Sequence, residues 1–313
     1  MDYRRLNLVT KPQFYPQRSI DEILFKIASA MIISIFDMPS AYMQIGLEHL
    51  SQQYSAFTTH LGAYAFSRMS FGLKNAAYSL SMLMDMILGT LRNHTENYHD
   101  DIYVFSNDIQ SHFGHIEESL IAIIKANIVI SAEKSKLFRK QANILDHRVG
   151  QGFIRPDQDK TEAVMKMKPP KKRTGVRSFL GMTSFFRKFI KDYAKTARPL
   201  TQLTSENVAW TWGKQQDEAF AALKTKLCEG PVLRAPDWDK PWYLITDASS
   251  GAIGSWLSQR HDSVLHPVAY HSRQLKSSEL AWTLDAYEGE TLAIYDSIRK
   301  FKPFLYSARL IIL

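Results

Sequence analysis

Residues 95–106 read TENYHDDIYVFS, and the two adjacent aspartates in this stretch, Asp100 and Asp101, raise the first structural question. The apolar residues that follow them, 102–105, are typical of a buried strand. Two like charges at the mouth of a buried strand repel each other, and burying them without a partner is costly. The pair therefore either lies in a solvated turn or binds a cation, and this stretch alone leaves both open.

The composition is that of an ordinary globular protein. The chain has 313 residues, 45% of them hydrophobic and 22% charged, which predicts about two domains. One cysteine, Cys228, supports neither a disulfide framework nor a four-ligand zinc site. The N-terminus has no apolar signal core, and no run approaches the ~20 apolar residues of a membrane helix. We therefore expect an intracellular protein, in the cytoplasm or the nucleus, without a membrane partner.

The positive charge is concentrated in one segment. The whole chain carries a net charge of +8, whereas residues 160–198 alone contain twelve Lys or Arg and two acidic residues. This segment also contains five aromatic residues: Phe179, Phe185, Phe186, Phe189 and Tyr193. A solvated helical face is one interpretation of such a run. Because the run carries aromatic as well as basic side chains, we favour contact with a nucleic acid.

Hydrophobic periodicity predicts a mixed order of helices and strands. The first half reads as a helix over 18–30, a buried strand over 31–36, a hairpin near Leu61-Gly62, a helix over 75–91 and a turn that leads into the strand after Asp101. From about residue 210 the pattern predicts a helix, three strands, a long helix over 281–301 and the start of another strand. The fold class is therefore α+β.

Carboxylates follow two of the predicted strands. Asp37 ends the strand over 31–36, and Asp100 and Asp101 precede another strand. Successive strand residues point to opposite faces, so both aspartates of the pair approach one site only from a tight hairpin turn. Carboxylates and water are the ligands that suit Mg²⁺ or Mn²⁺, and two such ions promote in-line displacement at phosphorus. Without further information, a solvated turn at Asp100-Asp101 remains an equal alternative.

The order of several motifs resembles that of a known family. MDYRRLN, FDMPSAYMQI, FGLKNAAYS, YHDDIYVFS, RSFLGMTSFFRKFIKDYAKTARPLTQL, LITDASSGAIGSWLSQ and HPVAYHSRQL occur in this sequence in that order. Together they resemble the Pol polyprotein of gypsy-type long-terminal-repeat retrotransposons. The resemblance implies a reverse transcriptase palm with partial fingers over 1–150, a basic thumb and connection over 151–209, and a ribonuclease H-like α/β domain over 210–313 that lacks its C-terminal part.

The resemblance also implies roles for residues of the palm. Asp37, Asp100 and Asp101 match the catalytic aspartates that hold Mg²⁺ or Mn²⁺, with the pair in the turn of a hairpin. Tyr42 matches the aromatic residue under the incoming sugar, and Phe71 and Gly72 match a segment near the nucleotide. Tyr42 and Phe71 could instead be core aromatics. The implied partners are a template-primer of RNA or DNA, deoxynucleoside triphosphates and other parts of the Pol polyprotein.

Further roles are implied outside the palm centre. Arg4 matches a template contact at the junction of fingers and palm, and Leu145 and His147 fall where the primer grip would lie. Asp247 and Glu290 match the first two metal-binding carboxylates of ribonuclease H, although Glu290 could be a surface charge. The basic residues expected to contact template or primer are Lys171, Lys172, Arg173, Arg177, Arg187 and Lys188.

The sequence departs from the family pattern at several places. His99 stands where an apolar residue is usual, and the strand before it reads HTEN instead of a run of valines, which makes it a poor strand former. Ser70 and Ala77 replace prolines, and Asp146 replaces a glycine of the primer grip, which would put a carboxylate beside primer phosphates. The finger strands that hold the triphosphate in this family are absent from the sequence, and the ribonuclease H-like region stops before the third and fourth carboxylates of the family. The departures suggest a fragment, an incomplete gene model or a decaying copy.

The order of the motifs and the family that it resembles imply an RNA-directed DNA polymerase that adds nucleotides to a primer 3′-hydroxyl by a two-metal mechanism. One rival is an inactive relic that only binds nucleic acid through residues 160–198, and another is an assembly subunit of a polyprotein particle. We also expect the chain as given not to cleave the RNA of an RNA–DNA hybrid, because two carboxylates hold a pair of Mg²⁺ ions poorly.

Overall fold

The computed structural model describes residues 1–229, 232–280, 285–306 and 308–313, and these form two compact units, Met1–Ala142 and Asn143–Leu313. The division of the chain into three domains remains a prediction. No helix in the described ranges is long and apolar enough to cross a membrane.

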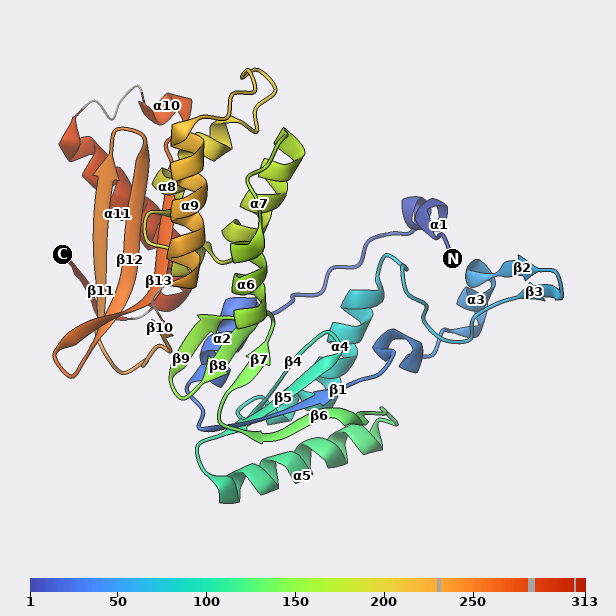
Figure 1. Cartoon of the computed structure of the whole chain (residues 1–313). Coiled ribbons are helices and arrows are strands. Elements are labelled where there is room, and N and C mark those ends of the chain that lie inside the picture. The colour runs from blue at the N-terminus through green and yellow to red at the C-terminus, as the bar shows by residue number, and fades with distance from the viewer. Residues whose placement is uncertain (230–231, 281–284, 307) are drawn as a thin grey trace. The chain divides into compact units, whose positions relative to one another are not determined.

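A four-stranded antiparallel sheet forms the centre of the first unit (Figure 1). Its strand order is β4 (Thr95–Tyr98), β5 (Asp101–Ser106), β1 (Ile32–Asp37) and β6 (Ser131–Arg139). β1 reads IISIFD and is buried over its four central residues, so both of its faces are covered. An apolar run without alternation is what such a strand requires.

Two helices cover one face of this sheet and complete the core. They are α4 (Ala76–Leu88) and α5 (Ile109–Lys125), and α5 begins where the Asp108 side chain accepts a hydrogen bond from the Ser111 amide at 2.8 Å. The core between sheet and helices consists of apolar side chains: Phe36, Met38, Ala41, Leu80, Met84, Leu88, Ile102, Val104, Ile123 and Ile128. The other face of β5 meets α2 (Ile20–Ala28), where Lys26 lies over the Phe105 ring.

Short elements surround this core. They are α1 (Arg4–Val9), η1 (Ala41–Gln44), α3 (His49–Gln52), η2 (Gln53–Ser55), β2 (Phe57–Thr59), β3 (Gly62–Tyr64) and η3 (Gly89–Leu91). β2 and β3 form the hairpin expected at Leu61-Gly62.

The second unit contains two further four-stranded sheets. The first has the order β10 (Leu233–Arg234), β9 (Phe153–Pro156), β8 (His147–Gly150) and β7 (Ala142–Ile144), and β7 starts at the last residue of the first unit. The second has the order β13 (Val264–Gln274), β12 (Ala252–His261), β11 (Trp242–Ser249) and β14 (Leu310–Ile312). β14 runs parallel to β11, whereas the other pairs of this sheet are antiparallel.

Helices cover both faces of the last sheet (Figure 1). α11 (Ala286–Leu305) packs on the face of Ala248, because a Cβ placed on Gly289 would lie 3.3 Å from the Ala248 Cβ. α8 (Tyr193–Gln202) packs on the opposite face, where the Ala194 amide donates to Ser272 Oγ at 2.9 Å. The remaining helices are α6 (Gln158–Lys166), α7 (Arg173–Phe185), η4 (Arg187–Phe189), α9 (Lys214–Cys228) and α10 (Ser277–Leu280).

Most of the expected elements are present, and two differ. The HTEN stretch, which we expected to be a poor strand, contributes to β4, and its residues 95–97 are buried. Residues 131–139, for which the sequence predicted no strand, form the nine-residue β6 beside β1. Of the helix expected over 281–301, residues 281–284 lie outside the described residues, and the helix spans Ala286–Leu305.

Candidate active site

The register of the first sheet brings two of the expected catalytic aspartates together. Asp37, the last residue of β1, lies directly opposite Asp101, the first residue of β5. Residues that face each other across an antiparallel pair project from the same side of the sheet. The ends of two strands far apart in the sequence therefore place two carboxylates on one face.

The third aspartate lies in the hairpin turn between β4 and β5. Tyr98 faces Asp101, so His99 and Asp100 form the turn, and His99 has a φ of 50°, in the left-handed region. The Asp100 carbonyl accepts a hydrogen bond from the Met38 amide at 2.8 Å. This contact joins the turn to the residue after Asp37 and leaves the Asp100 side chain exposed to solvent.

The electrostatics of the site are dominated by burial and like charge. Burial raises the pKa of the Asp101 carboxyl, and the nearby charges of Asp100 and Asp37 raise this pKa further. The Tyr103 hydroxyl, which donates to Asp101 Oδ2 at 3.2 Å, and the charge of Lys136 oppose this shift. Burial, followed by the charge of Asp101, also raises the pKa of Tyr103. The site favours protonation of Asp101 or a cation beside it.

The donor set fits a divalent cation of the magnesium type. Asp37 Oδ2 is buried, accepts no hydrogen bond from the described residues, and has the Lys134 ammonium group 3.5 Å away. Carboxylate oxygens are the ligands that Mg²⁺ and Mn²⁺ prefer. As they stand, no three His, Cys, Asp or Glu side chains of the described ranges gather closely enough to hold a metal ion. Asp37, Asp100 and Asp101 are the residues that would hold such an ion, and its positive charge would offset the repulsion that raises the Asp101 pKa.

The residues expected near the nucleotide gather beside the same turn. The Tyr42 and Phe71 rings meet edge to face, with centroids 5.4 Å apart, and Phe71 is 54% exposed. Burial raises the pKa of Tyr42, and the charge of Asp100 raises it further, which places the phenol near the hairpin. Gly72 has a φ of 88°, which favours glycine, and its carbonyl accepts from Asn7 Nδ2 at 2.8 Å.

Arg4 is engaged locally. Its guanidinium donates to both oxygens of Asp2, with Nη2 to Oδ2 at 2.6 Å, and both side chains are exposed. A contact between Arg4 and a template would require this pair to open or to share the guanidinium.

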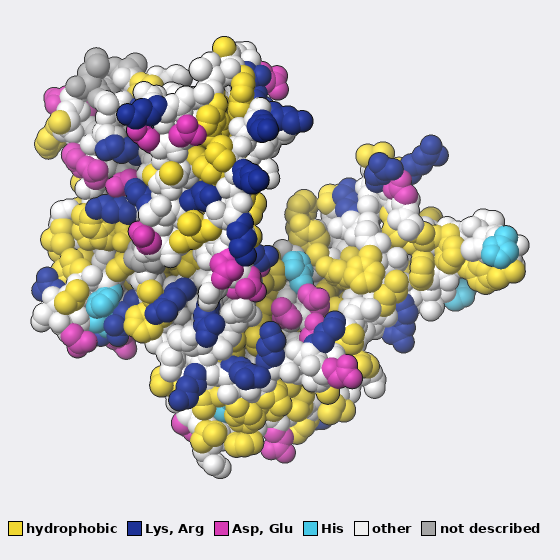
Figure 2. All heavy atoms as spheres, in the orientation of Figure 1, with side chains coloured by type: hydrophobic (Ala, Val, Ile, Leu, Met, Phe, Trp, Pro, Cys, Tyr) yellow, Lys and Arg dark blue, Asp and Glu magenta, His cyan; other side chains and the backbone are white. Residues whose placement is uncertain are grey.

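Some basic side chains of residues 160–198 contact other parts of the protein, and others are exposed to solvent. Arg173 donates to the carbonyls of Leu203 and Val208, Arg177 donates to the Thr204 carbonyl at 2.8 Å, and Arg187 donates to the Ser272 carbonyl. Lys188 lies over the Phe189 ring, with Nζ 5.4 Å from the centroid. Lys171 and Lys172, in contrast, have exposed side chains just before α7. Figure 2 shows Lys and Arg side chains along α6 and α7.

The aromatic residues of this segment are not a stacking surface. Phe179, Phe186, Phe189 and Tyr193 are buried, and only Phe185, at 45%, is exposed. Their helical spacing reflects the core of the second unit, where Phe179 packs on Phe220 with ring centroids 4.4 Å apart. The buried aromatic residues therefore do not support the expected nucleic-acid contact, which now depends on the charge of the segment.

The expected primer-grip residues form a tight turn between β7 and β8. Leu145 and Asp146 have φ angles of 50° and 62°, and His147 opens β8 as a buried residue. Asp146 pairs with Lys160 at 3.1 Å, so its carboxylate has a cationic partner of its own.

The two expected ribonuclease H carboxylates come from adjoining elements. Asp247 lies in β11 and Glu290 in the first turns of α11. Glu290 Oε1 accepts from the amide of Ala248, the residue after Asp247, at 3.3 Å. Both carboxylates are exposed, so this pair is accessible to solvent.

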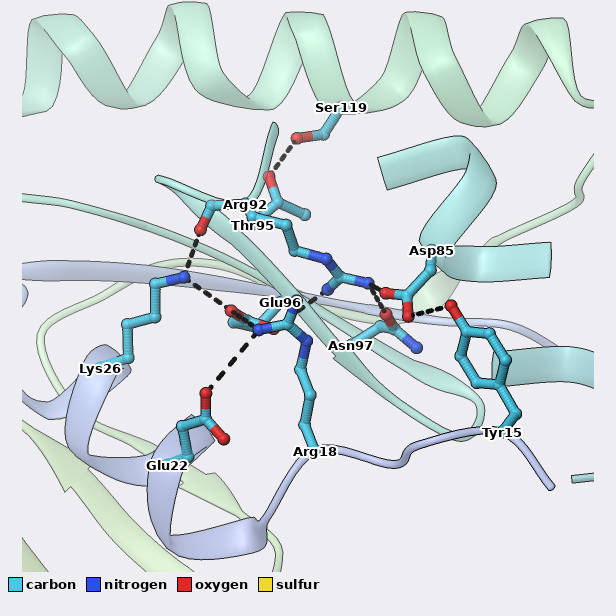
Figure 3. Close-up of polar contacts among 10 residues, drawn as sticks. All are labelled: Tyr15, Arg18, Glu22, Lys26, Asp85, Arg92, Thr95, Glu96, Asn97 and Ser119. Atoms are coloured by element: carbon cyan, nitrogen blue, oxygen red, sulfur yellow. Dashed lines mark hydrogen bonds and ion pairs between the residues drawn. The ribbon is translucent and has the colours of Figure 1, made fainter. Parts of the chain in front are cut away.

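Sequence reasoning missed a charged cluster beside the hairpin. Glu96 of β4 is only 1% exposed, and Lys26, Arg92 and Arg18 surround its carboxylate (Figure 3). The sequence showed that HTEN departs from an apolar strand. It did not show the partners of Glu96, because Arg18 and Lys26 lie 78 and 70 positions away from it.

Comparison with protein families identifies the class to which this protein belongs. Residues 1–183 match the family of reverse transcriptases (RNA-dependent DNA polymerases). Residues 212–312 match the RNase H-like domain found in reverse transcriptases. The chain belongs to the reverse transcriptase family, with an RNase H-like domain after the polymerase region.

Three curated relatives of the chain are transposon polyproteins. The chain is 37% identical to the retrovirus-related Pol polyprotein from transposon opus of Drosophila melanogaster, over 98% of this chain and 32% of the relative. It is 35% identical to the corresponding polyprotein from transposon 297 of the same organism, over 100% and 29%. It is 31% identical to the transposon Tf2-3 polyprotein of Schizosaccharomyces pombe (strain 972 / ATCC 24843), over 98% and 23%. The chain thus spans about a third or less of these relatives, and the resemblance to retrotransposon Pol polyproteins is confirmed.

Solved structures share the fold. A foamy viral protease-reverse transcriptase in complex with double-stranded DNA superposes with a TM-score of 0.90 at 19% identity, over 99% of this chain and 54% of that chain. The same type of protein in complex with an RNA/DNA hybrid gives a TM-score of 0.85, over 99% and 42%. The α+β fold of a reverse transcriptase palm and thumb with a ribonuclease H-like domain is confirmed.

Proposed function

We propose that this chain is an RNA-directed DNA polymerase of a retrotransposon, which adds deoxynucleotides to the 3′-hydroxyl of a primer on an RNA or DNA template. The observation that supports this most is the register that sets Asp37 opposite Asp101 with Asp100 in the adjoining turn. Membership of the reverse transcriptase family supports the assignment of nucleotide addition to these three carboxylates.

Each residue of the site has a part in this proposal. Asp37 and Asp101 supply carboxylate oxygens on one face, and Asp100 supplies another from the turn. A pair of Mg²⁺ or Mn²⁺ ions, when bound, would activate the primer hydroxyl and neutralise the leaving pyrophosphate. Tyr42 and Phe71 offer an aromatic surface beside Asp100 for the sugar of the nucleotide. Gly72 lets the backbone approach without a side chain.

The partners follow from the charge distribution. Lys171 and Lys172 are the exposed cations that we assign to template or primer phosphates, and Arg4, Arg173, Arg177, Arg187 and Lys188 contribute positive charge from positions bound to the protein. Deoxynucleoside triphosphates are the second proposed substrate, beside the template-primer. Because these nucleotides are found inside cells, the proposed activity is intracellular. Further segments of a Pol polyprotein are the remaining proposed partners.

Hydrolysis by the ribonuclease H-like domain is a separate question. Glu290 accepts from the amide of the residue after Asp247, and no group of three His, Cys, Asp or Glu side chains that could hold a metal ion occurs among the described residues. Because two carboxylates organise a pair of Mg²⁺ ions poorly, these 313 residues are expected not to cleave an RNA–DNA hybrid. Cleavage by the purified chain that disappears in Asp247→Asn would contradict this.

Primer extension tests the polymerase proposal. The purified chain is incubated with Mg²⁺, four deoxynucleoside triphosphates and a labelled primer on an RNA or DNA template, and it should extend the primer. When one nucleotide is omitted, extension should stop where the template first calls for that nucleotide. Asp101→Asn should lose this extension, whereas Asp239→Asn, an exposed aspartate of the second unit, should retain it. A wild-type chain that binds template-primer but extends nothing would show that it only binds nucleic acid.

A further inference from the structure

The buried carboxylate of Glu96 has three cationic neighbours from three parts of the first unit (Figure 3). Lys26 Nζ lies 2.7 Å from Oε1, Arg92 Nη1 lies 3.0 Å from Oε2, and Arg18 Nη1 lies 3.5 Å from Oε1. Lys26 belongs to α2, Arg18 to the segment before α2, and Arg92 to the turn before β4. A carboxylate that is 1% exposed requires such partners, because an unpaired buried charge is costly.

The cations of this cluster have further acidic partners. Arg92 Nη2 pairs with Asp85 of α4 and donates to Asn97 Oδ1 at 2.9 Å. Tyr15 donates to Asp85 Oδ2 at 2.7 Å. Glu22 approaches Arg18 at 3.9 Å. Three cations and three carboxylates thus balance, and they connect α2, α4 and β4.

The cluster adjoins the hairpin that carries Asp100 and Asp101, on the same face of the sheet as Asp101. Glu96 faces Tyr103 across the β4–β5 ladder, and Tyr98, two residues further on, faces Asp101. Residues two apart on a strand share a face, so Glu96 lies on the face of Tyr103 and Asp101, which are themselves joined by a hydrogen bond. A small pocket is lined both by Arg92 and Asn97 of this region and by Tyr98 and His99 of the hairpin.

Stability alone is a weak explanation for this arrangement. Replacing a buried ion cluster by well-packed apolar residues is often neutral or stabilising. Apolar residues would also form the strand β4 more readily than Thr95, Glu96 and Asn97 do. Charged hydrogen bonds differ from apolar packing in that they fix direction and register. The cluster therefore fixes where β4 lies relative to α2 and α4.

We infer that Glu96 is a positioning residue for nucleotide addition: through Lys26, Arg92 and Arg18 it fixes β4, and with β4 it fixes the turn that carries Asp100 and the placement of Asp101. This inference rests on the proposed polymerase function. Glu96 itself contacts neither nucleotide nor primer; it acts through the Tyr98–Asp101 end of the ladder.

The test compares Glu96→Gln with Glu22→Gln in the full chain. Both variants remove one carboxylate charge, but Glu22 is on the exposed side of the cluster, with a side chain 62% exposed. Single-nucleotide addition is measured well below the melting temperature of each variant, together with hydrogen exchange of the amides of residues 98–101. Glu96→Gln should lower kcat about tenfold or more, because small misplacements of reacting groups have large effects. KM for the nucleotide should stay within about twofold, and hairpin exchange should become faster. Glu22→Gln should match the wild type.

The outcomes separate this inference from the function on which it rests. If Glu96→Gln lowers only the melting temperature and leaves kcat and hairpin exchange unchanged, the positioning role is wrong and the cluster is structural. If the wild type adds no nucleotide, the proposed function fails, and hairpin exchange alone then decides whether Glu96 positions the turn. If Glu96→Gln does not fold, Arg92→Lys replaces it in the test. Lysine keeps the positive charge but cannot pair with Glu96 and Asp85 at the same time, as the two guanidinium nitrogens of Arg92 do. The same fall in kcat is expected, and an unchanged kcat overturns the inference.

Discussion

The two acidic pairs of this molecule differ in how the fold surrounds them. Asp37 and Asp101 lie opposite each other at the ends of two core strands, and burial and like charge raise the pKa of Asp101. Asp247 and Glu290 come from a strand and a helix, are joined through the Ala248 amide, and are exposed. The same side-chain chemistry is thus placed in a repulsive, partly buried setting in one unit and in a solvated setting in the other. Carboxylates that repel each other in a partly buried site, as Asp37, Asp100 and Asp101 do, indicate cation binding more strongly than two carboxylates that are exposed to solvent.

The largest expected difference between the pairs is in activity. Asp37→Asn should lower templated nucleotide addition by at least about 10²-fold, as does the loss of a single charge-stabilising group in other enzymes. Asp247→Asn should leave addition unchanged. Steady-state primer extension with both variants measures this difference. Equal loss in both variants would mean that the second unit contributes to the polymerase site.

Nucleic-acid affinity provides the next comparison. Lys171→Ala together with Lys172→Ala should reduce the salt dependence of template-primer binding by about 2 in log–log slope, since each phosphate contact contributes about 0.9. Arg173 is left in place because it holds two carbonyls of the protein. Fluorescence anisotropy at several salt concentrations measures the slope. An unchanged slope would show that these two lysines face only solvent.

Stability should respond in the opposite direction to activity at Asp101. Because its pKa is raised in the folded protein, ionised Asp101 destabilises the fold above its unfolded pKa. Asp101→Asn should therefore raise the melting temperature by a few degrees at pH 7, and this advantage should disappear as the pH falls below about 4 and the wild-type carboxyl becomes protonated. Thermal unfolding at both pH values tests the sign, and a lower melting temperature for the variant at pH 7 would contradict the repulsion described above.

The smallest effect is expected at the exposed pair. Glu290→Gln keeps an oxygen that accepts from the Ala248 amide, and surface changes of this kind alter stability by less than about 0.5 kcal/mol. Denaturant unfolding should give the same midpoint as the wild type. A large loss would show that this carboxylate is part of the core of the second unit, and would weaken the contrast between the two pairs.

The sequence predicted the apolar parts of the fold better than the polar parts. The strand that ends at Asp37 and the strand after Asp101 followed from local runs of apolar residues, and the resemblance placed the hairpin between them. The resemblance implied a strand before the turn, but the local pattern did not predict β4, because Glu96 and Asn97 are poor strand formers whose burial depends on Arg18, Lys26 and Arg92. Such distant ion pairs leave no periodic signal in a single sequence.

The remaining errors also have physical causes. β6 reads SAEKSKLFR, and its side chains are largely exposed, as expected for an edge strand protected by lysines; that pattern conceals a strand. In the basic segment, aromatic residues at helical spacing indicated a core rather than a stacking surface. The charges of that segment were visible in the sequence, but the carbonyls that bind Arg173, Arg177 and Arg187 became visible only in the fold.

The central claim is that Asp37, Asp100 and Asp101 form the metal-binding centre for nucleotide addition. Crystals of the full chain with template-primer and Mn²⁺ would test it by anomalous diffraction at the manganese edge. We predict a manganese peak within coordination distance of the Asp37 and Asp101 carboxylates. Occupied manganese at Asp247 and Glu290 with none between Asp37 and Asp101 would contradict the account.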